Sequence, residues 1–204
     1  MSSPQHGHLD RLRDVADAVD SLRSIWTAEF ADALNHLVNT ATDAIAGADG
    51  VSVSVLGDAA PGTAAATDER SAQLDAEQYR TARGPCLEAA ETRQPVRLVV
   101  ARESRRYQSF VAAARRHGIT ATLSAPLVVD AADGDPSMIG SLNIYSATVP
   151  EFDAFDERLA TMLTSVAGSA LAAARSRQSL RRQTDQFSTA LISRSTIDQA
   201  KGAL

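Results

Sequence analysis

This 204-residue chain has few of the residue types that build covalent or metal-held scaffolds. It has one cysteine, Cys86, which excludes an internal disulfide framework and a cysteine cluster for a metal. Its four histidines, at positions 6, 8, 36 and 117, lack the helical spacing of a zinc-binding pair. We therefore expect neither a metal site nor a bound cofactor.

Long apolar runs and phosphate-binding glycine loops are missing as well. No segment approaches the roughly 18 apolar residues that a membrane span needs, and the first residues contain no apolar signal region. The turn sequences GDAAPG and DGDPS lack the context of nucleotide loops, and Ser52 and Ser54 have no neighbouring histidine. The sequence thus predicts a cytosolic protein that is not an enzyme and does not contact membranes.

What is present is the composition of one sizeable core, with 44% hydrophobic and 22% charged residues. The net charge of −5 is unevenly distributed along the chain. Residues 175–204 carry a net charge of +4, so the remainder carries −9. An acidic body followed by a basic end argues against a general nucleic-acid coat but favours a local contact with something anionic.

Both ends of the chain show the periodicity of long helices. Apolar residues recur every three or four positions over residues 9–45, and residues 155–204 contain no proline. In the second segment, a heptad repeat is formed by Leu159, Val166, Ala173, Leu180 and Phe187. Such stripes favour a coiled coil or helical bundle that joins a homodimer. The alternative is that the two helices pack against each other within one chain.

Between these helices, the pattern alternates between strands and short helices. We expect strands at residues 50–57, 63–67, 96–100, 119–129 and 137–147, the first two forming a hairpin. Helices are expected at residues 86–91 and 107–117, with a polar helix at residues 68–78 serving as a surface connector. The sequence therefore predicts an α+β fold, an antiparallel sheet flanked by helices, with its core between residues 30 and 174.

Several short motifs follow one another in this central region. They are formed by Gln78, Tyr79, Gly84, Pro85, Cys86, Leu87 and Ala89; Pro95 and Val96; Arg106 and Phe110; Ser124, Pro126 and Leu127; and Ile139, Gly140, Leu142, Asn143, Tyr145 and Ser146. In this order and spacing, residues 30–174 resemble a GAF domain of the actinobacterial type that is fused to ANTAR domains. The resemblance implies a sensor for an unknown small ligand. Candidates to line its pocket are Tyr79, Tyr107 and Tyr145, although aromatic residues in such positions are also typical of a core.

The last fifteen residues, ALISRSTIDQAKGAL, resemble the opening of an ANTAR domain, an RNA-binding antiterminator module. The resemblance implies that Arg194 and Lys201 face RNA hairpins, while Arg181 and Arg182 add attraction for phosphate. The family's module has about two further helices after this point. We therefore expect a truncated start of the module, with weak RNA binding and little base readout. The alternative is an ordinary amphipathic helix over residues 187–204.

These observations predict three regions: an N-terminal helix (1–29), a GAF-like sensor domain (30–174), and a linker helix with the truncated start of an ANTAR domain (175–204). The predicted function is a signal-sensing regulator whose GAF domain controls an RNA-binding output in transcription antitermination. One alternative is a thiol-based redox sensor or reductase that uses Cys86, although a free cysteine is often a buried structural residue. Another is a bare dimerisation module.

Overall fold

The computed structural model describes residues 28–56, 60–103, 105–130, 136–173 and 176. Its centre is a five-stranded sheet in the order β2-β1-β5-β4-β3, in which every neighbouring pair of strands is antiparallel. The strands are β1 (Gly50–Val55), β2 (Gly62–Ala66), β3 (Val96–Val99), β4 (Ala121–Asp130) and β5 (Pro136–Ser146). The predicted α+β class with an antiparallel sheet is confirmed.

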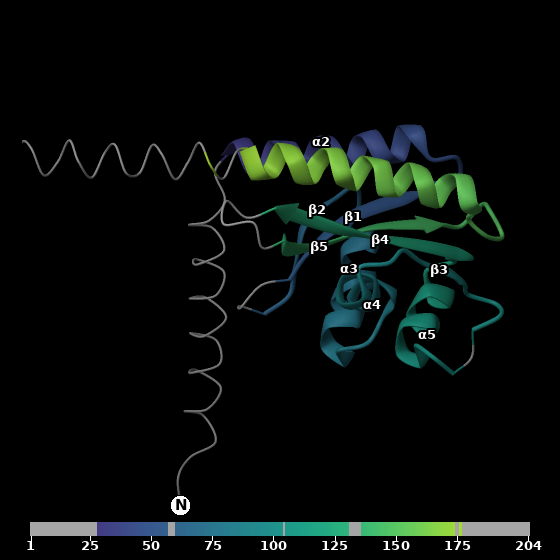
Figure 1. Ribbon diagram of the computed structural model, residues 1–204. Helices are drawn as coiled ribbons and strands as arrows, with labels where there is room; N and C mark the ends of the chain where they lie inside the picture. Colours follow the sequence, from purple (N-terminus) through teal and green to yellow (C-terminus); the bar gives the residue numbers. More distant parts are fainter. Residues whose placement is uncertain (1–27, 57–59, 104, 131–135, 174–175, 177–204) are drawn as a thin grey trace, which may run out of the picture.

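Helices cover both faces of the sheet, as Figure 1 shows. The helix α2 (Ala28–Ala44) lies beside a second helix, residues 154–173, on one face. On the other face lie α3 (Glu69–Thr81), α4 (Pro85–Thr92) and α5 (Gln108–Arg116). The helices predicted for residues 1–27 and 177–204 lie outside the described residues. Within the described part of the chain, no helix is both long and apolar enough to span a bilayer.

The helix α2 is amphipathic, and its spacing explains which side faces the sheet. Its apolar residues recur three or four positions apart and are buried: Phe30, Leu34, Leu37, Val38 and Ala41. The opposite side is polar and exposed at Asp32, Asn35, His36 and Asn39. One turn of a helix takes 3.6 residues, so this spacing places all the apolar side chains on one face.

The helix at residues 154–173 lies very close to β4. A side chain at Gly168 would place its Cβ 2.1 Å from the carbonyl oxygen of Val128. Only glycine permits this approach of helix backbone to strand backbone. Leu171 and Ala160 are also fully buried on this face, so the helix is closely fitted to the strand beneath it.

The two faces of the sheet differ in chemistry. Side chains on successive strand residues point to opposite faces, so the alternating V-S-V-S-V of β1 separates valines from serines. Toward α2, the strands present Val51, Val53, Leu123, Leu127, Leu142 and Ile144, all within the main apolar core. Toward α3 and α4, they present serine, threonine, asparagine and tyrosine, which are equally buried.

One prediction about α3 is wrong. The polar helix expected as a surface connector buries Ser71, Leu74, Asp75 and Gln78 and forms part of the cover over the polar sheet face. The helix starts where the carboxylate of Asp68 accepts a hydrogen bond from the backbone N–H of Ser71 at 2.7 Å. Its polarity does not mean exposure, because the polar side chains of Asp75, Gln78 and Tyr79 bond to partners in other elements.

Candidate functional site

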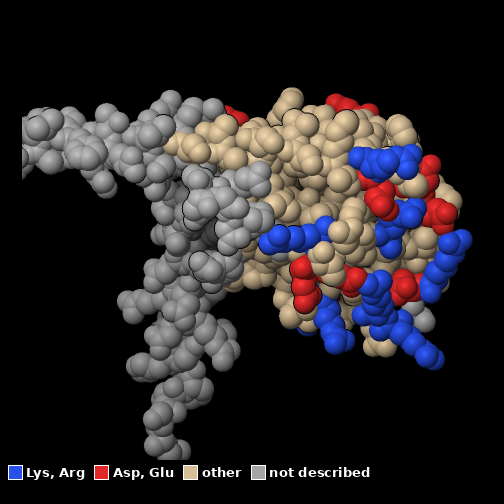
Figure 2. Space-filling view, in the orientation of Figure 1, with Lys and Arg blue, Asp and Glu red and all other residues tan. Residues whose placement is uncertain are grey.

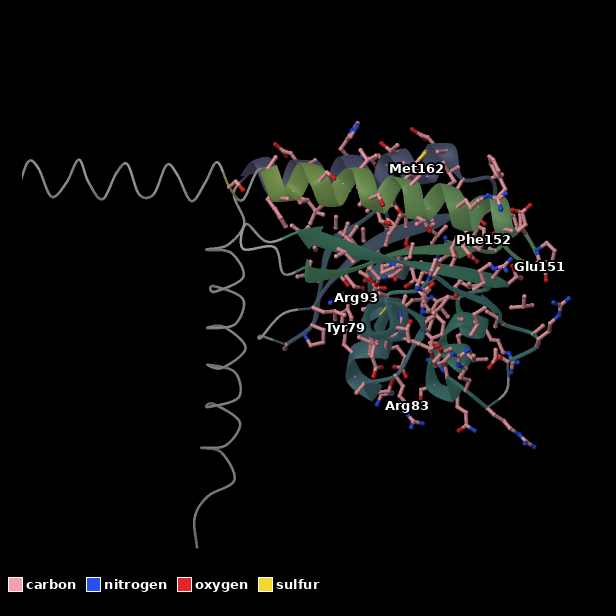
Figure 3. The ribbon with its side chains drawn as sticks, in the orientation of Figure 1. Tyr79, Arg83, Arg93, Glu151, Phe152 and Met162 are labelled. Atoms are coloured by element: carbon pink, nitrogen blue, oxygen red, sulfur yellow. The ribbon has the colours of Figure 1, made fainter. Side chains whose placement is uncertain are left out.

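A cluster of buried polar side chains lies between the sheet and the helices α3 and α4. From the sheet it contains Ser52, Ser54, Thr122, Ser124, Ser141, Asn143 and Tyr145, each at most 1% exposed. From α3 it contains Asp75 and Gln78, which are fully buried, and Tyr79, and from β2 it contains Thr63; Tyr79 and Thr63 are half-buried. We call these residues the buried polar cluster. Figure 3 shows Tyr79 beneath the sheet, on the side of α3 and α4.

Asp75 is the centre of the cluster and is completely buried. Its carboxylate accepts hydrogen bonds from the Tyr145 hydroxyl at 2.5 Å, the Thr63 hydroxyl at 2.9 Å and the Asn143 amide at 3.1 Å. The Ser52 hydroxyl is a further donor. These four donors come from three strands, so one carboxylate links α3 to β1, β2 and β5.

Burial and hydrogen bonding act on Asp75 in opposite directions. Removal from water disfavours the charged carboxylate, whereas the four donors favour it. Burial has the larger effect and raises the pKa of Asp75 from 3.8 to about 6. The carboxylate is therefore ionised at neutral pH yet poised near the pH at which it takes up a proton.

Asn143 organises the sheet side of the cluster. Its amide oxygen accepts from the hydroxyls of Ser124 and Ser141, each at 3.0 Å. Its amide nitrogen donates to the Ser54 hydroxyl at 2.8 Å as well as to Asp75. A single side chain thus connects three strands and one helix, and the chain is rigidly cross-linked at this point.

Gln78 joins α3 to the start of α4. Its side-chain oxygen accepts a hydrogen bond from the backbone N–H of Cys86 at 2.9 Å, in a place where α4 has no capping side chain of its own. Gly84 makes room for this amide, because a Cβ there would lie 2.2 Å from the Gln78 side-chain oxygen. Pro85 occupies the first turn, where its lack of an N–H costs nothing.

Cys86 is a free cysteine in the first turn of α4 and is completely buried. Burial raises the pKa of its thiol, and the negative charge of Asp75 raises it further. The reactive form of cysteine is the thiolate, so both effects oppose reactivity. This environment is typical of a structural cysteine and does not favour the hypothesis of a redox sensor or reductase.

The cluster has unused hydrogen-bonding capacity. The hydroxyl of Thr122 is buried and has no hydrogen-bond partner among the described residues. Thr122 lies on β4 directly opposite Tyr145 on β5, so the unpaired hydroxyl belongs to the polar face of the sheet. A buried polar group without a partner costs free energy, and a bound molecule or a water can supply the missing bond.

The three tyrosines predicted to line a pocket do not all meet. Tyr79 and Tyr145 both belong to the buried polar cluster, where the Tyr79 hydroxyl donates to Ser54 at 2.7 Å. Tyr107 lies apart, at the start of α5, where its hydroxyl donates to the Glu88 carboxylate. The guanidinium of Arg106 lies over its ring, 5.1 Å from the centroid.

A surface hollow lies elsewhere among the described residues. It has a volume of about 580 Å³ and runs along β3 to Glu151 and Phe152, which Figure 3 labels. Its charges are already paired, with Arg97 bound to Glu157 at 2.8 Å and Arg106 bound to Glu88. This hollow lacks the convergent donors and acceptors that the buried polar cluster provides.

Sequence reasoning missed most of the cluster, above all Asp75, Asn143 and Ser52. A signal was present, because three predicted strands each carried small polar residues at alternate positions. An exposed sheet face produces the same signal, however. The candidates Arg181, Arg182, Arg194 and Lys201 lie outside the described residues.

Comparisons with solved structures show the same fold. The chain is similar to the GAF-B domain of DevS from Mycobacterium smegmatis (19% sequence identity, TM-score 0.52, covering 74% of this chain and 98% of that chain). It is also similar to the GAF domain/HD domain protein from Geobacter sulfurreducens (15% sequence identity, TM-score 0.54, covering 72% of this chain and 94% of that chain). A third similar structure is the type II free methionine-R-sulfoxide reductase from Thermoplasma acidophilum (16% sequence identity, TM-score 0.50, covering 70% of this chain and 92% of that chain).

At these identities the structures show the fold alone. No curated protein matches the sequence significantly. The family model described as GAF domain matches residues 27–172, which is well over half of the chain. The sequence motifs, the antiparallel sheet with helices on both faces and this match agree, and the protein belongs to the GAF domain family.

Proposed function

We propose that the protein is a signal-sensing regulator, in which the buried polar cluster binds a small polar molecule and thereby controls an RNA-binding ANTAR output in transcription antitermination. The observation that carries the proposal is the contrast between the two faces of the sheet. One face is packed with apolar side chains, whereas the other is equally buried but polar. GAF domains are typical of signal-sensing regulators, which is consistent with this role.

The polar face is difficult to explain by stability alone. A buried hydrogen-bonded network gains little over an apolar core of the same shape, because every group in it must first lose its contact with water. Asp75 and Thr122 illustrate this cost, since one is a desolvated carboxylate and the other an unpaired hydroxyl. A network of this kind suits a ligand that exchanges hydrogen bonds with it. The ionised Asp75 favours a ligand that donates hydrogen bonds or carries positive charge.

The strands β4 and β5 connect the buried polar cluster to the helix that precedes the proposed RNA-binding segment. These strands carry Thr122, Ser124, Asn143 and Tyr145 on the face of the cluster. Their opposite face contacts the helix at residues 154–173, with Gly168 against Val128. A shift of the strands on ligand binding therefore acts directly on this helix, which continues in sequence toward residues 175–204.

The output itself rests on the resemblance of residues 190–204 to the start of an ANTAR domain. In that resemblance Arg194 and Lys201 face RNA, and Arg181 and Arg182 provide additional positive charge. Contacts of arginine and lysine with phosphate release counterions, so binding by such residues weakens steeply as salt concentration rises.

We also propose that the regulator is a homodimer. The helix at residues 154–173 exposes three large apolar side chains on its outer side, namely Phe155 (63% exposed), Met162 (55%) and Val166 (67%). Their spacing of seven and four places them along one side of the helix. The outer side of α2 is polar, so within the described residues this stripe belongs to the second helix alone.

A titration of labelled hairpin RNA tests the output. The full chain is mixed with the RNA at two salt concentrations, alongside the variants Arg194→Gln and Lys201→Gln. We expect dissociation constants on the order of 10⁻⁶ to 10⁻⁴ M that weaken with salt, and a further loss in each variant. Arg158→Gln, on the helix at residues 154–173, is the matched control and should bind as the wild type does. Binding that is insensitive to both variants would contradict the proposed output.

A further inference from the structure

A second site lies on the surface, where the turn between α3 and α4 meets the start of α5. Two adjoining hollows are found there, with volumes of about 160 Å³ and 390 Å³, and both are lined by Arg83, Arg106 and Tyr107. Figure 2 shows several basic side chains, with acidic ones among them, over the lower part of the molecule, and Figure 3 places Arg83 at its lower end, far from the sheet. The site is thus separate from the buried polar cluster.

The smaller hollow is strongly basic. Arg83, Arg105 and Arg106 line it, and no Asp or Glu among the described residues does. Arg106 is partly neutralised by its ion pair with Glu88. Arg83 and Arg105 form no ion pair with any described carboxylate. Two guanidinium groups that lie outside the described ion pairs therefore line one small space in a chain whose net charge is −5.

The backbone adds to the positive potential. The helix α5 begins at the hollow, and its first residues Gln108 and Ser109 line the wall. No side chain caps this helix at Tyr107, and its first turn contains no acidic residue. The N–H groups at a helix start attract anions, and the first two residues of this helix line the same hollow as the arginines.

Guanidinium groups arranged in this way match a particular kind of anion. Each presents a planar fork of N–H donors, and several forks around one space suit an anion with several terminal oxygens and a charge near −2. A single carboxylate offers two oxygens and one charge, whereas a phosphate monoester offers three terminal oxygens. The smaller hollow therefore fits the phosphate group.

The larger hollow differs, because Leu87, Glu88 and Glu91 complete its wall. Carboxylates repel a second anionic group but accept hydrogen bonds from hydroxyl groups. We propose that this surface binds a hydroxyl-bearing organic phosphate, with its phosphate against Arg83 and Arg105 and its organic part beside Glu91. The site gives the regulator an input that is independent of the buried polar cluster.

The test uses the full chain, labelled with ¹⁵N, and three probes at constant ionic strength: ribose 5-phosphate, inorganic phosphate and ribose. We expect saturable shifts of the Gln108 and Ser109 amide signals with ribose 5-phosphate, weaker binding of inorganic phosphate and no effect of ribose. Arg83→Gln and Arg105→Gln should each weaken binding on the order of tenfold. Both side chains project from the surface, so the variants should keep the wild-type spectrum elsewhere.

Arg158→Gln removes one positive charge on the opposite face of the sheet and is the control for net charge. It should leave binding unchanged. An equal loss in all three variants, or shifts that rise without saturation, would reduce the site to general attraction of anions and overturn the proposal. Equal affinities for ribose 5-phosphate and inorganic phosphate would overturn the proposal that the larger hollow binds the organic part of the ligand.

Discussion

The side-chain oxygen of Gln78 accepts a hydrogen bond from the backbone N–H of Cys86 at 2.9 Å. This bond explains the spacing of the motif around it. The Gln78 side chain acts as the missing cap of α4, whose own N-cap residue is Gly84, and Gly84 provides the space that the amide occupies. Gln78 and Cys86, eight positions apart in sequence, thus hold α4 over the polar face of the sheet.

Gly84→Ala should destabilise the protein through Gln78. The backbone of Gly84 is extended, so alanine causes no backbone strain there. The new Cβ instead displaces the Gln78 amide and leaves the Cys86 N–H without a partner, at a cost of about 1–3 kcal/mol. Urea denaturation of the wild type and the variant measures this difference.

The double variant Gly84→Ala with Gln78→Ala separates this contact from other effects. If the clash with Gln78 is the cause, adding Gly84→Ala to Gln78→Ala should cost much less than adding it to the wild type. Additive costs in the two backgrounds would show that Gly84 is required for another reason.

Cys86 should be unreactive in the folded protein. Its thiol is buried and its pKa is raised, so little thiolate forms at pH 8. We expect slow labelling by iodoacetamide in buffer and rapid labelling in urea. Cys86→Ala should leave dimerisation and RNA binding unchanged. Rapid labelling of the folded protein, or loss of either property with the fold retained, would revive the redox hypothesis.

The exposed stripe on the helix at residues 154–173 should be a dimer contact. Met162→Glu and Val166→Glu each place a charge where we expect an apolar side chain to be buried by the partner. We expect the dissociation constant of the dimer, measured by analytical ultracentrifugation, to rise at least about tenfold for each variant. Because both side chains are exposed in the monomer, its stability should change little.

Asn35→Glu is the control for added charge, since Asn35 lies on the polar outer side of α2. Dimers that persist in both stripe variants, or that dissociate equally in the control, would show that the stripe is not the contact.

The sequence predicts where the strands lie but not which of their polar faces is buried. The alternation of valine and serine in β1 predicts a strand with two unlike faces, and the structure has one. Whether Ser52 and Ser54 face water or a buried network depends on what covers them. That cover is α3, whose partners on β5 lie about seventy positions away in sequence.

The burial of Asp75 is likewise not predictable from the local sequence. In the sequence it is one acidic residue in a polar helix, and such helices are usually solvated. Its burial follows from contacts with Tyr145 and Asn143, which local patterns do not contain. Leu74 and Gln78 share its side of the helix, but a single leucine among polar residues is a weak signal of a buried face.

Asp75 should make stability depend on pH. Its pKa is raised from 3.8 to about 6 in the folded state, so the folded state binds the proton more tightly than the unfolded state. The resulting stabilisation is fully present only below the unfolded pKa of 3.8 and is lost as pH rises through about 6. A shift of this size corresponds to about 3 kcal/mol in full, of which about 2 kcal/mol falls between pH 4 and pH 7.

The variant Asp75→Asn isolates this contribution. Carboxyls with lowered pKa values, such as Asp49 and Asp153, lose their stabilisation as pH falls, and this opposing effect is common to wild type and variant. Asparagine stays neutral, so the cost of the substitution should be larger at pH 4 than at pH 7 by about 2 kcal/mol. Urea denaturation at pH 4, 5, 6 and 7 measures it, with Asp43→Asn on the exposed side of α2 as control. A cost that is equal at all four pH values would mean that Asp75 titrates alike in both states, and that its four hydrogen bonds fully offset its burial.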